Sequence, residues 1–422
     1  MEKFIVAHTE KLEGKVRISG AKNAVLPILA ATLLTEERCI IENVPALRDV
    51  ECMVSILEKL GADITFFRAE ERIEIEAKNI DPTANIEEEC GEMRASFLIA
   101  GALLGRFLEG RVAMPGGCQI GSRPIDLHLK GFHALGVKSK LEHGIVDLLA
   151  KRIRGTTIYL DFPSVGATEN LMMLATLGKG KTIIENAAAE PEIVDLANCL
   201  RSMGADIVGD GGDTIAITGV TSLHGCTHSV IADRIEAGTF MVGVAMLGGD
   251  IVLENVQEEH LKPVIAKLSE CGVKMESEED GKTLRVYRKG KLQPLQVKTM
   301  PFPGFPTDMQ AQFMSLMTII KGTSIITETV FENRFIHANE LQRMGADIRI
   351  ESRNALIEGV DELTGSKVKA TDLRGGAALI LSAMKAKGET EIGEIQHIER
   401  GYYRIDEKLR ALGGCIRKVE LE

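Results

Sequence analysis

The 422-residue sequence contains no tryptophan, and aromatic residues make up only 4% of it. A hydrophobic core must therefore be built from Ala, Ile, Leu, Val and Met, which suits helices packed on strands. Long apolar runs are missing as well, because the most apolar stretch, residues 97–108, is too short to span a bilayer and is interrupted by Arg106. We therefore expect a soluble, cytoplasmic protein without a signal peptide.

An excess of basic residues is also absent, since 61 acidic residues outnumber 50 basic ones and the net charge is −11. This balance argues against a broad nucleic-acid or acidic-membrane surface, so an anionic ligand would need a local basic pocket. The eight cysteines form no CxxC pair in a chain far longer than a disulfide-stapled mini-domain, and we expect them to be reduced.

The strongest organisational signal is an internal repeat. A helix-like stretch that ends in glycine and is followed by strand-like alternation recurs six times, with successive glycines 75, 68, 68, 73 and 68 residues apart: Gly61, Gly136, Gly204, Gly272, Gly345 and Gly413. Six apolar helical stretches run in phase with it, beginning at Lys22, Met93, Ala167, Glu236, Asp308 and Leu373. Because each is apolar on nearly all sides, we expect it to be buried inside a domain.

One repeat thus reads strand, buried helix, strand, amphipathic helix, strand. A chain of 422 residues exceeds what one core usually serves, so six repeats predict two domains of three. We place them at residues 22–232 and at 233–422 together with 1–21, because the last repeat lacks its own following strand. A doubly wound α/β protein with accidental periodicity is the alternative.

The starts of three buried helices carry the cations Lys22, Arg94 and Arg374. Helix N-termini favour anions, so these residues indicate an anion site, although each alone could be a solvated residue of a helix end. Residues 115–124 place three glycines and two prolines around Cys118. We expect a mobile, sharply turned loop that exposes this thiol, and Arg123 nearby would lower its pKa and raise its reactivity. The alternative is a loop cysteine without a role.

Ten motifs in order along the chain resemble those of the UDP-N-acetylglucosamine 1-carboxyvinyltransferases, a branch of the enolpyruvyl transferase family. They are SGAKNAVLP (19–27), MRAS (93–96), PGGCQIGSRPIDLH (115–128), SVGATEN (164–170), ENAAAEPEIVD (185–195), DRIEAGTF (233–240), FPTDMQAQF (305–313), ENRF (332–335), DLRGG (372–376) and HIERGY (397–402). The resemblance implies an inside-out α/β barrel with substrates bound between two three-repeat domains. It also implies addition and elimination between phosphoenolpyruvate and the sugar 3′-hydroxyl, in peptidoglycan precursor synthesis, without a metal or organic cofactor.

The resemblance assigns roles residue by residue. Cys118 would protonate C3 of phosphoenolpyruvate and can form a covalent adduct, and Asp308 would be the base for the 3′-hydroxyl. Lys22 and Arg400 would complete the catalytic set. The residues expected to contact phosphoenolpyruvate are Lys22, Asn23, Arg94, Arg123, Arg334, Arg374 and Arg400. Those expected to contact UDP-N-acetylglucosamine are Asn23, Arg94, Arg123, Pro124, Ile125, Asp126, Leu127, Ser164, Val165, Gly166, Asp308 and Val330.

Some positions and rivals stay open. Phe162 stands where some relatives have lysine, which puts a diphosphate contact in doubt, and Glu190 and Asp308 could simply be helix-start carboxylates. The rivals are 5-enolpyruvylshikimate-3-phosphate synthase, an inactive regulatory paralogue, and a cysteine hydrolase that uses His128 as base. An RNA 3′-terminal phosphate cyclase shares part of the repeat architecture, but its catalytic histidine has no evident counterpart here. We expect small-molecule partners only and a monomer.

Overall fold

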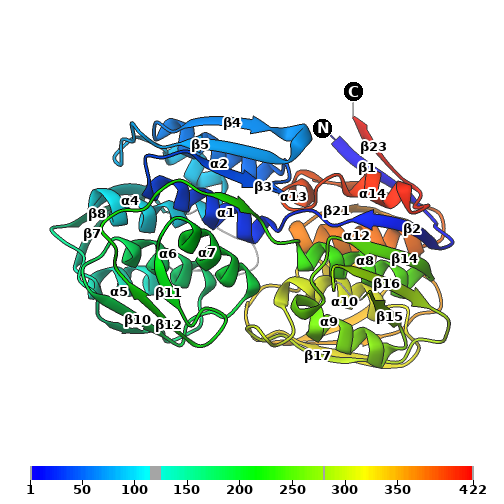
Figure 1. Ribbon diagram of the computed structural model, residues 1–422. Helices are drawn as coiled ribbons and strands as arrows, with labels where there is room; N and C mark the ends of the chain where they lie inside the picture. Colours follow the sequence, from blue (N-terminus) through cyan, green and yellow to red (C-terminus); the bar gives the residue numbers. More distant parts are fainter. Residues whose placement is uncertain (1, 115–124, 279–280, 421–422) are drawn as a thin grey trace. The chain divides into compact units, whose positions relative to one another are not determined.

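The computed structural model describes residues 2–114, 125–278 and 281–420, which form two compact units (Figure 1). The terminal unit contains residues 2–19 and 232–420, and the middle unit contains residues 20–114 and 125–231. The units divide after Ser19 and Ile231, where the repeat pattern places divisions after residues 21 and 232. Each unit is described by itself below.

The terminal unit contains three four-stranded sheets. Its strands are β1 (Glu2–Ala7), β2 (Leu12–Arg17), β14 (Gly249–Glu254), β15 (Lys274–Ser277), β16 (Thr283–Arg288), β17 (Gln296–Lys298), β18 (Thr323–Thr327), β19 (Asp347–Glu351), β20 (Asn354–Glu358), β21 (Lys367–Lys369), β22 (Glu389–Gly393) and β23 (Ile416–Glu420). Its helices are α8 (Arg234–Leu247), α9 (Glu258–Cys271), η4 (Thr307–Met309), α10 (Gln310–Met317), α11 (Ala338–Arg343), α12 (Leu373–Lys385), α13 (Gln396–Glu399) and α14 (Ile405–Ala411).

The middle unit contains two four-stranded sheets and one three-stranded sheet. Its strands are β3 (Cys39–Glu42), β4 (Asp63–Phe67), β5 (Arg72–Glu76), β6 (Glu109–Ala113), β7 (Val137–Glu142), β8 (Ile145–Ala150), β9 (Thr157–Tyr159), β10 (Lys181–Glu185), β11 (Asp206–Val208), β12 (Thr214–Thr218) and β13 (Thr227–Ser229). Its helices are α1 (Lys22–Ala31), η1 (Thr32–Leu34), α2 (Arg48–Lys59), η2 (Arg68–Glu70), α3 (Glu87–Glu92), η3 (Arg94–Leu98), α4 (Ile99–Phe107), α5 (Asp126–Ala134), α6 (Val165–Thr176) and α7 (Pro191–Ser202).

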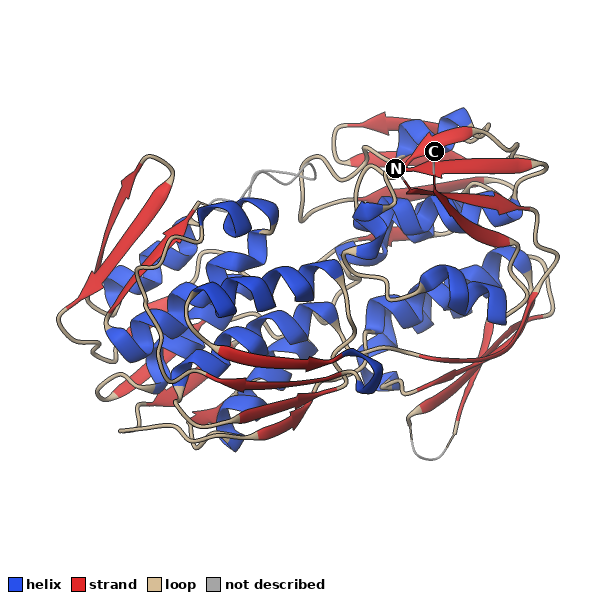
Figure 2. Ribbon diagram, turned by 90° about the horizontal axis from the view of Figure 1, so that it is seen from above, coloured by secondary structure: helices blue, strands red, loops and turns tan. Residues whose placement is uncertain are grey.

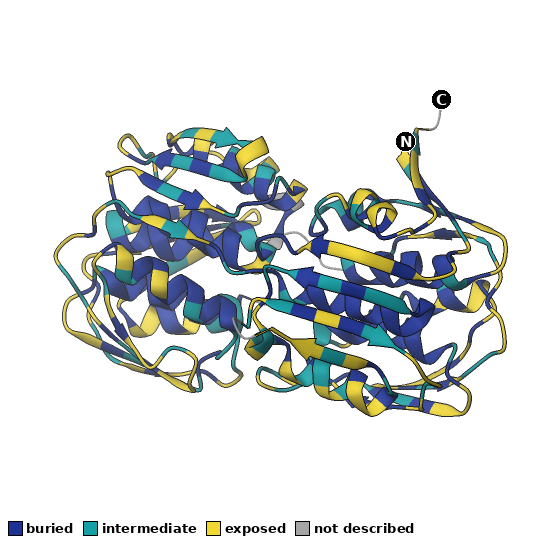
Figure 3. Ribbon diagram, turned by 45° about the vertical axis from the view of Figure 1, so that its right-hand side comes forward, coloured by how far each residue is buried: buried dark blue, intermediate teal, exposed yellow. Residues whose placement is uncertain are grey.

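In both units apolar helices lie inside and sheets lie towards the outside (Figure 2). The inner helices α1, α4, α6, α8, α10 and α12 are lined by buried residues nearly throughout, whereas the outer strands alternate buried and exposed positions (Figure 3). Helices that are apolar on all sides cannot face water, so they form the core. The predicted burial of six apolar helices is confirmed.

The predicted repeat is short by one strand. After each outer helix the chain generally makes an antiparallel hairpin, such as β4–β5 or β19–β20, where the sequence pattern suggested a single strand. The second strand of the hairpin then pairs antiparallel with the central strand of its sheet, as β20 does with β18. Both strands of these hairpins alternate apolar and polar residues, so one run could not be separated from two by periodicity alone.

The six period-matched glycines end the outer helices with φ between 94° and 107°. L-residues rarely adopt this backbone conformation, which explains why glycine recurs at the same phase of every repeat. Three asparagines at the ends of central strands also have positive φ, and each side-chain amide donates to a carbonyl of a neighbouring segment: Asn43 to Val230, Asn186 to Leu160 and Asn255 to Ile18. These positions are therefore structural features of the repeat.

The first two strands of the chain complete sheets built mainly from distant residues. β1 lies between β22 and β23 and pairs antiparallel with both, which supplies the strand that the last repeat lacks. β2 pairs parallel with β14. In the part of the chain that the structure describes, no helix is long and apolar enough to cross a membrane.

Candidate active site

Several predicted site residues lie outside the described residues. These are Cys118, Arg123 and Pro124. Arg94 begins η3, but its side chain is not among those that the structure describes.

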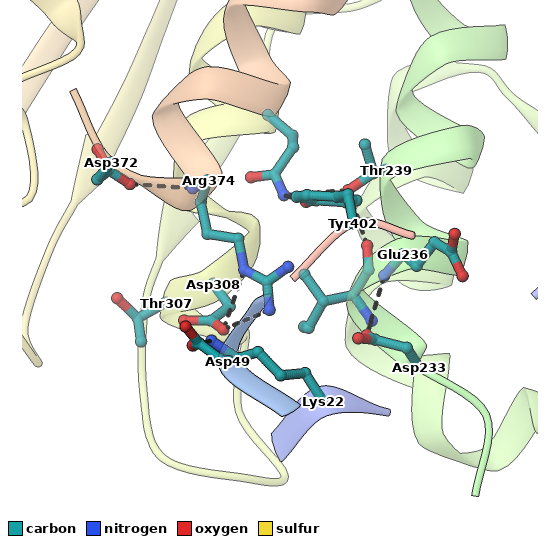
Figure 4. Close-up of polar contacts among 12 residues, drawn as sticks. Lys22, Asp49, Asp233, Glu236, Thr239, Thr307, Asp308, Asp372, Arg374 and Tyr402 are labelled. Carbon is teal, nitrogen blue, oxygen red and sulfur yellow. Dashed lines mark hydrogen bonds and ion pairs between the residues drawn. The ribbon is translucent and has the colours of Figure 1, made fainter. Parts of the chain in front are cut away.

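In the middle unit, Lys22 is the first residue of the buried helix α1. Its ammonium Nζ lies 3.1 Å from Oδ2 of Asp49 on α2, and the two side chains are 13% and 5% exposed (Figure 4). A carboxylate with so little water around it fixes the lysine in one position. Asn23 follows on the exposed side of the same helix.

The start of α6 positions Ser164, Val165 and Gly166. Ser164 is the N-cap residue, and its hydroxyl accepts a hydrogen bond from the backbone N–H of Ala167 at 3.4 Å. All three predicted residues are partly accessible. The N–H of Ser164 donates to the carbonyl of Phe162 at 2.7 Å, and the first turn of the helix leaves further N–H groups that favour an anion. Gly166 lies against the ring of His128, where a Cβ would come within 3.3 Å of a ring carbon.

The segment before and at the start of α5 holds three further predicted residues. Ile125 is buried and directly precedes the helix, Asp126 is exposed and Leu127 is partly buried. Of the three, Asp126 and Leu127 therefore present accessible surface. Phe162, the position where lysine occurs in some relatives, exposes 43% of its surface.

His128 is buried in the middle unit. Its Nδ1 lies 2.9 Å from Nδ2 of Asn170, and its ring makes an edge contact with Phe97 at a centroid distance of 5.2 Å. These contacts are those of a packed core histidine. The structure thus gives the proposed hydrolase base a structural role, as the sequence interpretation favoured.

The middle unit also contains two carboxyl groups near helix α6 and the start of α7, those of Glu169 and Glu190. Glu190 is the N-cap residue of α7, but its side chain makes no capping hydrogen bond, so the simple capping role does not apply. Glu169 is buried in α6, and its pKa is raised well above the usual value by burial and then by the carboxylates of Glu192 and Glu190. A carboxyl group in this position holds its proton more tightly than a solvated one.

In the terminal unit, Asp308 in η4 binds two arginines (Figure 4). Its Oδ1 lies 2.8 Å from Arg334, and its Oδ2 lies 3.0 Å from Arg374 at the start of α12. Both guanidinium groups are almost completely buried, at 4% and 3% exposure, while the Asp308 side chain is 25% exposed. Burial would raise the pKa of Asp308, but Arg374 and Arg334 outweigh it, so this pKa lies well below the usual range.

The capping alternative for Asp308 is wrong. The N-cap position of η4 is Pro306, and no side-chain capping bond is made there. The carboxylate instead points to the arginines, because two buried cations need a counter-charge more than a partly exposed helix start needs a cap. The sequence alone could not show these two partners, because Arg334 and Arg374 lie 26 and 66 residues away along the chain.

Val330, a predicted sugar-nucleotide contact, is positioned by Glu328. The buried carboxylate of Glu328 accepts hydrogen bonds from the backbone N–H groups of Val330 and Phe331, at 2.8 and 3.1 Å. It also accepts from the hydroxyl of Thr307, which in turn accepts from Arg334. One carboxylate therefore connects the predicted nucleotide contact with the arginine cluster.

Arg374 has two further neighbours. Its guanidinium lies 5.2 Å from the ring centroid of Tyr402, and the backbone N–H of Arg374 donates to the capping carboxylate of Asp372 (Figure 4). The Tyr402 hydroxyl lies 2.9 Å from that of Thr239 and accepts from the amide of Gln312. Arg400 is partly buried two residues before Tyr402.

Within the terminal unit, the structure thus joins Asp308, Arg334 and Arg374 into one cluster and links Val330 to it. Sequence reasoning missed four supporting residues: Glu328, Tyr402 and Asp372 in the terminal unit, and Asp49 beside Lys22 in the middle unit. Asp372 could have been found, because an aspartate before an apolar helical run is an N-cap signal. The others carry no local signal, since their role depends on contacts with residues far away in sequence.

Comparisons with known proteins place the chain in context. The family model described as EPSP synthase (3-phosphoshikimate 1-carboxyvinyltransferase) matches residues 6–409. A UDP-N-acetylglucosamine 1-carboxyvinyltransferase 2 of Carboxydothermus hydrogenoformans is 55% identical over 99% of this chain and 100% of its own length. The UDP-N-acetylglucosamine 1-carboxyvinyltransferase 1 of Caldanaerobacter subterraneus is 54% identical over 98% of this chain and 99% of its own.

Solved structures are similar over the whole chain. The enolpyruvyl transferase NikO from Streptomyces tendae aligns with a TM-score of 0.89 and 25% identity, covering 100% of this chain and 99% of its own. EPSP synthase from Acinetobacter baumannii aligns with a TM-score of 0.77 and 18% identity, with full coverage of both chains. The fold is therefore the inside-out α/β arrangement of these proteins, as the sequence predicted.

Proposed function

The chain belongs to the EPSP synthase (3-phosphoshikimate 1-carboxyvinyltransferase) family and, within it, to the UDP-N-acetylglucosamine 1-carboxyvinyltransferases, and we propose that it transfers the enolpyruvyl group of phosphoenolpyruvate to the 3′-hydroxyl of UDP-N-acetylglucosamine. Phosphate is the second product. The proposed reaction supplies a peptidoglycan precursor, needs no metal or organic cofactor, and takes place in the cytoplasm. We propose a monomer.

The observation that carries the proposal is the cluster of Arg334 and Arg374 around Asp308. Nε of Arg334 and Nη1 of Arg374 are buried and have no hydrogen-bond partner among the described residues, so both guanidinium groups keep a free donor in a region poor in water. A planar guanidinium pairs well with carboxylate and phosphate oxygens. This favours a substrate with several negative charges, as phosphoenolpyruvate has.

The cations act on the donor substrate in two ways. In the proposal, Lys22, Arg123 and Arg400 hold the phosphate and carboxylate of phosphoenolpyruvate, and Arg94, Arg334 and Arg374 stabilise charge that develops during reaction. The ion pair with Asp49 keeps the ammonium of Lys22 in place before substrate arrives. Prepositioned charges lower the barrier because they need not reorganise at the moment of reaction.

The chemistry is an addition followed by an elimination. The 3′-hydroxyl oxygen adds to C2 of phosphoenolpyruvate while Cys118 donates a proton to C3. Phosphate then leaves C2 with the electron pair of its C–O bond, as a C3 proton returns to the thiolate of Cys118. Asp308 accepts the hydroxyl proton in this scheme. Its low pKa makes it a weak base while both arginines are bound, so an anionic substrate that draws on the same arginines would raise its proton affinity.

The acceptor substrate is proposed to contact residues from several elements. Asn23, Ser164, Val165 and Gly166 stand at helix starts where N–H groups favour the diphosphate. Arg94, Arg123, Pro124, Ile125, Asp126, Leu127, Asp308 and Val330 complete the proposed set. Glu328 supports the proposal for Val330, because it fixes the backbone there by accepting the Val330 N–H at 2.8 Å.

The test is a comparison of acceptors. The protein is mixed with phosphoenolpyruvate and either UDP-N-acetylglucosamine or shikimate 3-phosphate, and phosphate release is followed over time. We expect release with the sugar nucleotide alone. Release with shikimate 3-phosphate instead would assign the chain to the synthase rival, and release with neither would support the inactive paralogue.

A further inference from the structure

A cavity of about 840 Å³ lies in the terminal unit, among the C-terminal ends of its inner helices. Met246 near the end of α8, Ile320 just beyond α10 and Lys385 at the end of α12 all line it. Asp308 and Arg374 stand at the opposite, N-terminal ends of α10 and α12. The cavity is thus separate from the cluster assigned to phosphoenolpyruvate.

The wall of this cavity is rich in basic side chains. Arg288 at the end of β16, Lys291, Lys321, Lys385 and Lys387 line it. Two of these have carboxylate partners on the rim, since Lys321 lies 3.0 Å from Asp361 and Lys387 lies 3.9 Å from Glu362. Among the described residues, no carboxylate pairs with Arg288, Lys291 or Lys385.

Arg288 and Lys385 are held in an unfavourable state. The Nε of Arg288 is buried and has no hydrogen-bond partner among the described residues. Burial lowers the pKa of Arg288, and burial together with the nearby charge of Arg288 lowers the pKa of Lys385. Two like charges that share a partly buried wall without a counter-ion destabilise the protein unless an anion occupies the space between them.

The C-terminal ends of the inner helices explain only in part why basic side chains gather at this cavity. Helix C-termini carry partial negative charge and favour nearby cations. However, Arg288 comes from a strand, and its buried Nε bonds to no helix carbonyl. A side chain that merely completed a helix end would use its donors on the free carbonyls.

Apart from His8 and the carboxylates Asp361 and Glu362, the remaining wall is mostly apolar. Met246, Leu292, Ile319, Ile320 and Leu363 line the same cavity. A volume of this size, apolar walls and a few convergent polar groups are the features of a site for an organic small molecule. A guanidinium beside two ammonium groups selects phosphate oxygens within that class.

We propose that this cavity binds a phosphorylated organic metabolite, with Arg288, Lys385 and Lys291 on the phosphates and the apolar wall against its organic part. The site is separate from that of the proposed reaction and does not depend on it. Inorganic triphosphate and magnesium-free ATP serve as probes, because they share the phosphates and differ in the organic part.

Binding of both probes is measured by calorimetry with the full chain in phosphate-free buffer. We expect ATP to bind more tightly than triphosphate, and Arg288→Met and Lys385→Met each to weaken binding of both at least about tenfold. Arg285→Met is the matched control, because Arg285 lies on the same strand, is exposed and pairs with Asp250 at 2.6 Å. It should leave binding unchanged.

Three outcomes would overturn the proposal. They are binding of neither probe to the unaltered protein, binding of both probes by Arg288→Met and Lys385→Met as tightly as by the unaltered protein, and a loss of affinity in the Arg285→Met control as large as in those two variants. Triphosphate binding as tightly as ATP would contradict the statement that the apolar wall contacts an organic part of the ligand. The ligand-free melting temperature is a second readout. Arg288→Met should raise it by removing an unpaired charge, whereas a fall would mark Arg288 as a structural residue and contradict the proposal.

Discussion

The two units share one repeat but treat buried charge differently. In the terminal unit, the carboxylate of Asp308 lies between two buried arginines, and its pKa is lowered. In the middle unit, the buried carboxyl of Glu169 has two other glutamates as its electrostatic neighbours, and its pKa is raised. The same arrangement of inner helices thus favours the ionised form of Asp308 in the terminal unit and the protonated form of Glu169 in the middle unit. The partners of each residue decide this, because burial alone raises the pKa of both.

The largest expected effect concerns the thiol predicted in the middle unit. Fosfomycin, an epoxide that mimics phosphoenolpyruvate, should alkylate Cys118 and abolish turnover, because cations that hold the phosphonate place the epoxide beside the thiolate. Mass spectrometry of the treated protein identifies the modified residue. Cys118→Asp should keep an acid in place and lose the sensitivity.

The described thiols provide a rival for this assignment. Cys226 is partly buried, and its pKa is lowered, chiefly by hydrogen bonds with the thiols of Cys199 and Cys39. An adduct on Cys226, or on no cysteine, would contradict the role given to Cys118. Cys226→Ser should therefore leave the inactivation unchanged.

The next effect concerns Asp308. Asp308→Asn should lower turnover at least about a hundredfold, since asparagine cannot take up a proton. It should also destabilise the protein by about 3 kcal/mol, because two buried arginines lose their counter-charge. Steady-state kinetics and thermal unfolding measure the two effects separately.

Asp361→Asn is the control, because it removes the carboxylate of an ion pair in which both side chains are more than 80% exposed. It should change neither the turnover nor the melting temperature. If Asp308→Asn kept turnover within a few-fold of the unaltered protein, Asp308 would be a partner of the arginines only, and the base would have to be sought elsewhere.

The repeat, the inner helices and the residues that end the outer helices could all be predicted from the sequence. Gly61 and its five equivalents show a local backbone requirement that recurs at a fixed period, so the signal is visible in one chain. The pairing of Asp308 with Arg374 spans 66 residues and has no local signature. Glu328 likewise acts through hydrogen bonds that exist only once the chain is folded. Local rules therefore predicted the frame and many candidate residues, but not the contacts that orient them.

A smaller effect distinguishes Glu169 from Asp308, because the stability that each carboxyl group contributes depends on pH in opposite directions. The raised pKa of Glu169 means that the folded protein binds this proton more tightly than the unfolded chain. Its contribution to stability is thus lost as pH rises from the ordinary glutamate range, about 4.3, through the raised value. The lowered pKa of Asp308 has the opposite sign, so its contribution is present above the ordinary aspartate range, about 3.9, and is lost as pH falls through the lowered value.

Melting temperatures of Glu169→Gln and Asp308→Asn across about pH 2 to 8 test this difference. Glu169→Gln should be more stable than the unaltered protein at pH 8, and its advantage should shrink towards pH 4. Asp308→Asn should be less stable at every pH from about 4 to 8, and its deficit should shrink only below about 3.9, as pH falls through the lowered pKa of Asp308. Parallel curves for both variants would show that neither carboxyl group titrates as described.

The smallest expected effect compares two helix caps. Asp233 caps α8 in the terminal unit with two hydrogen bonds, at 2.8 and 3.0 Å, whereas Ser164 caps α6 in the middle unit with one at 3.4 Å. Asp233→Ala should cost about 2 kcal/mol and Ser164→Ala about 0.5 kcal/mol. Scanning calorimetry of the two variants gives the order, and a larger loss for Ser164→Ala would contradict the geometry.

Enolpyruvyl transfer by addition and elimination leaves a record in the hydrogen atoms of the product. Phosphoenolpyruvate and UDP-N-acetylglucosamine are turned over in D₂O, and the product is analysed by mass spectrometry and NMR. We expect a 3′-enolpyruvyl ether that carries deuterium on its vinyl carbon, because C3 passes through a methyl group. A product without deuterium, or with the group on another oxygen, would contradict this mechanism.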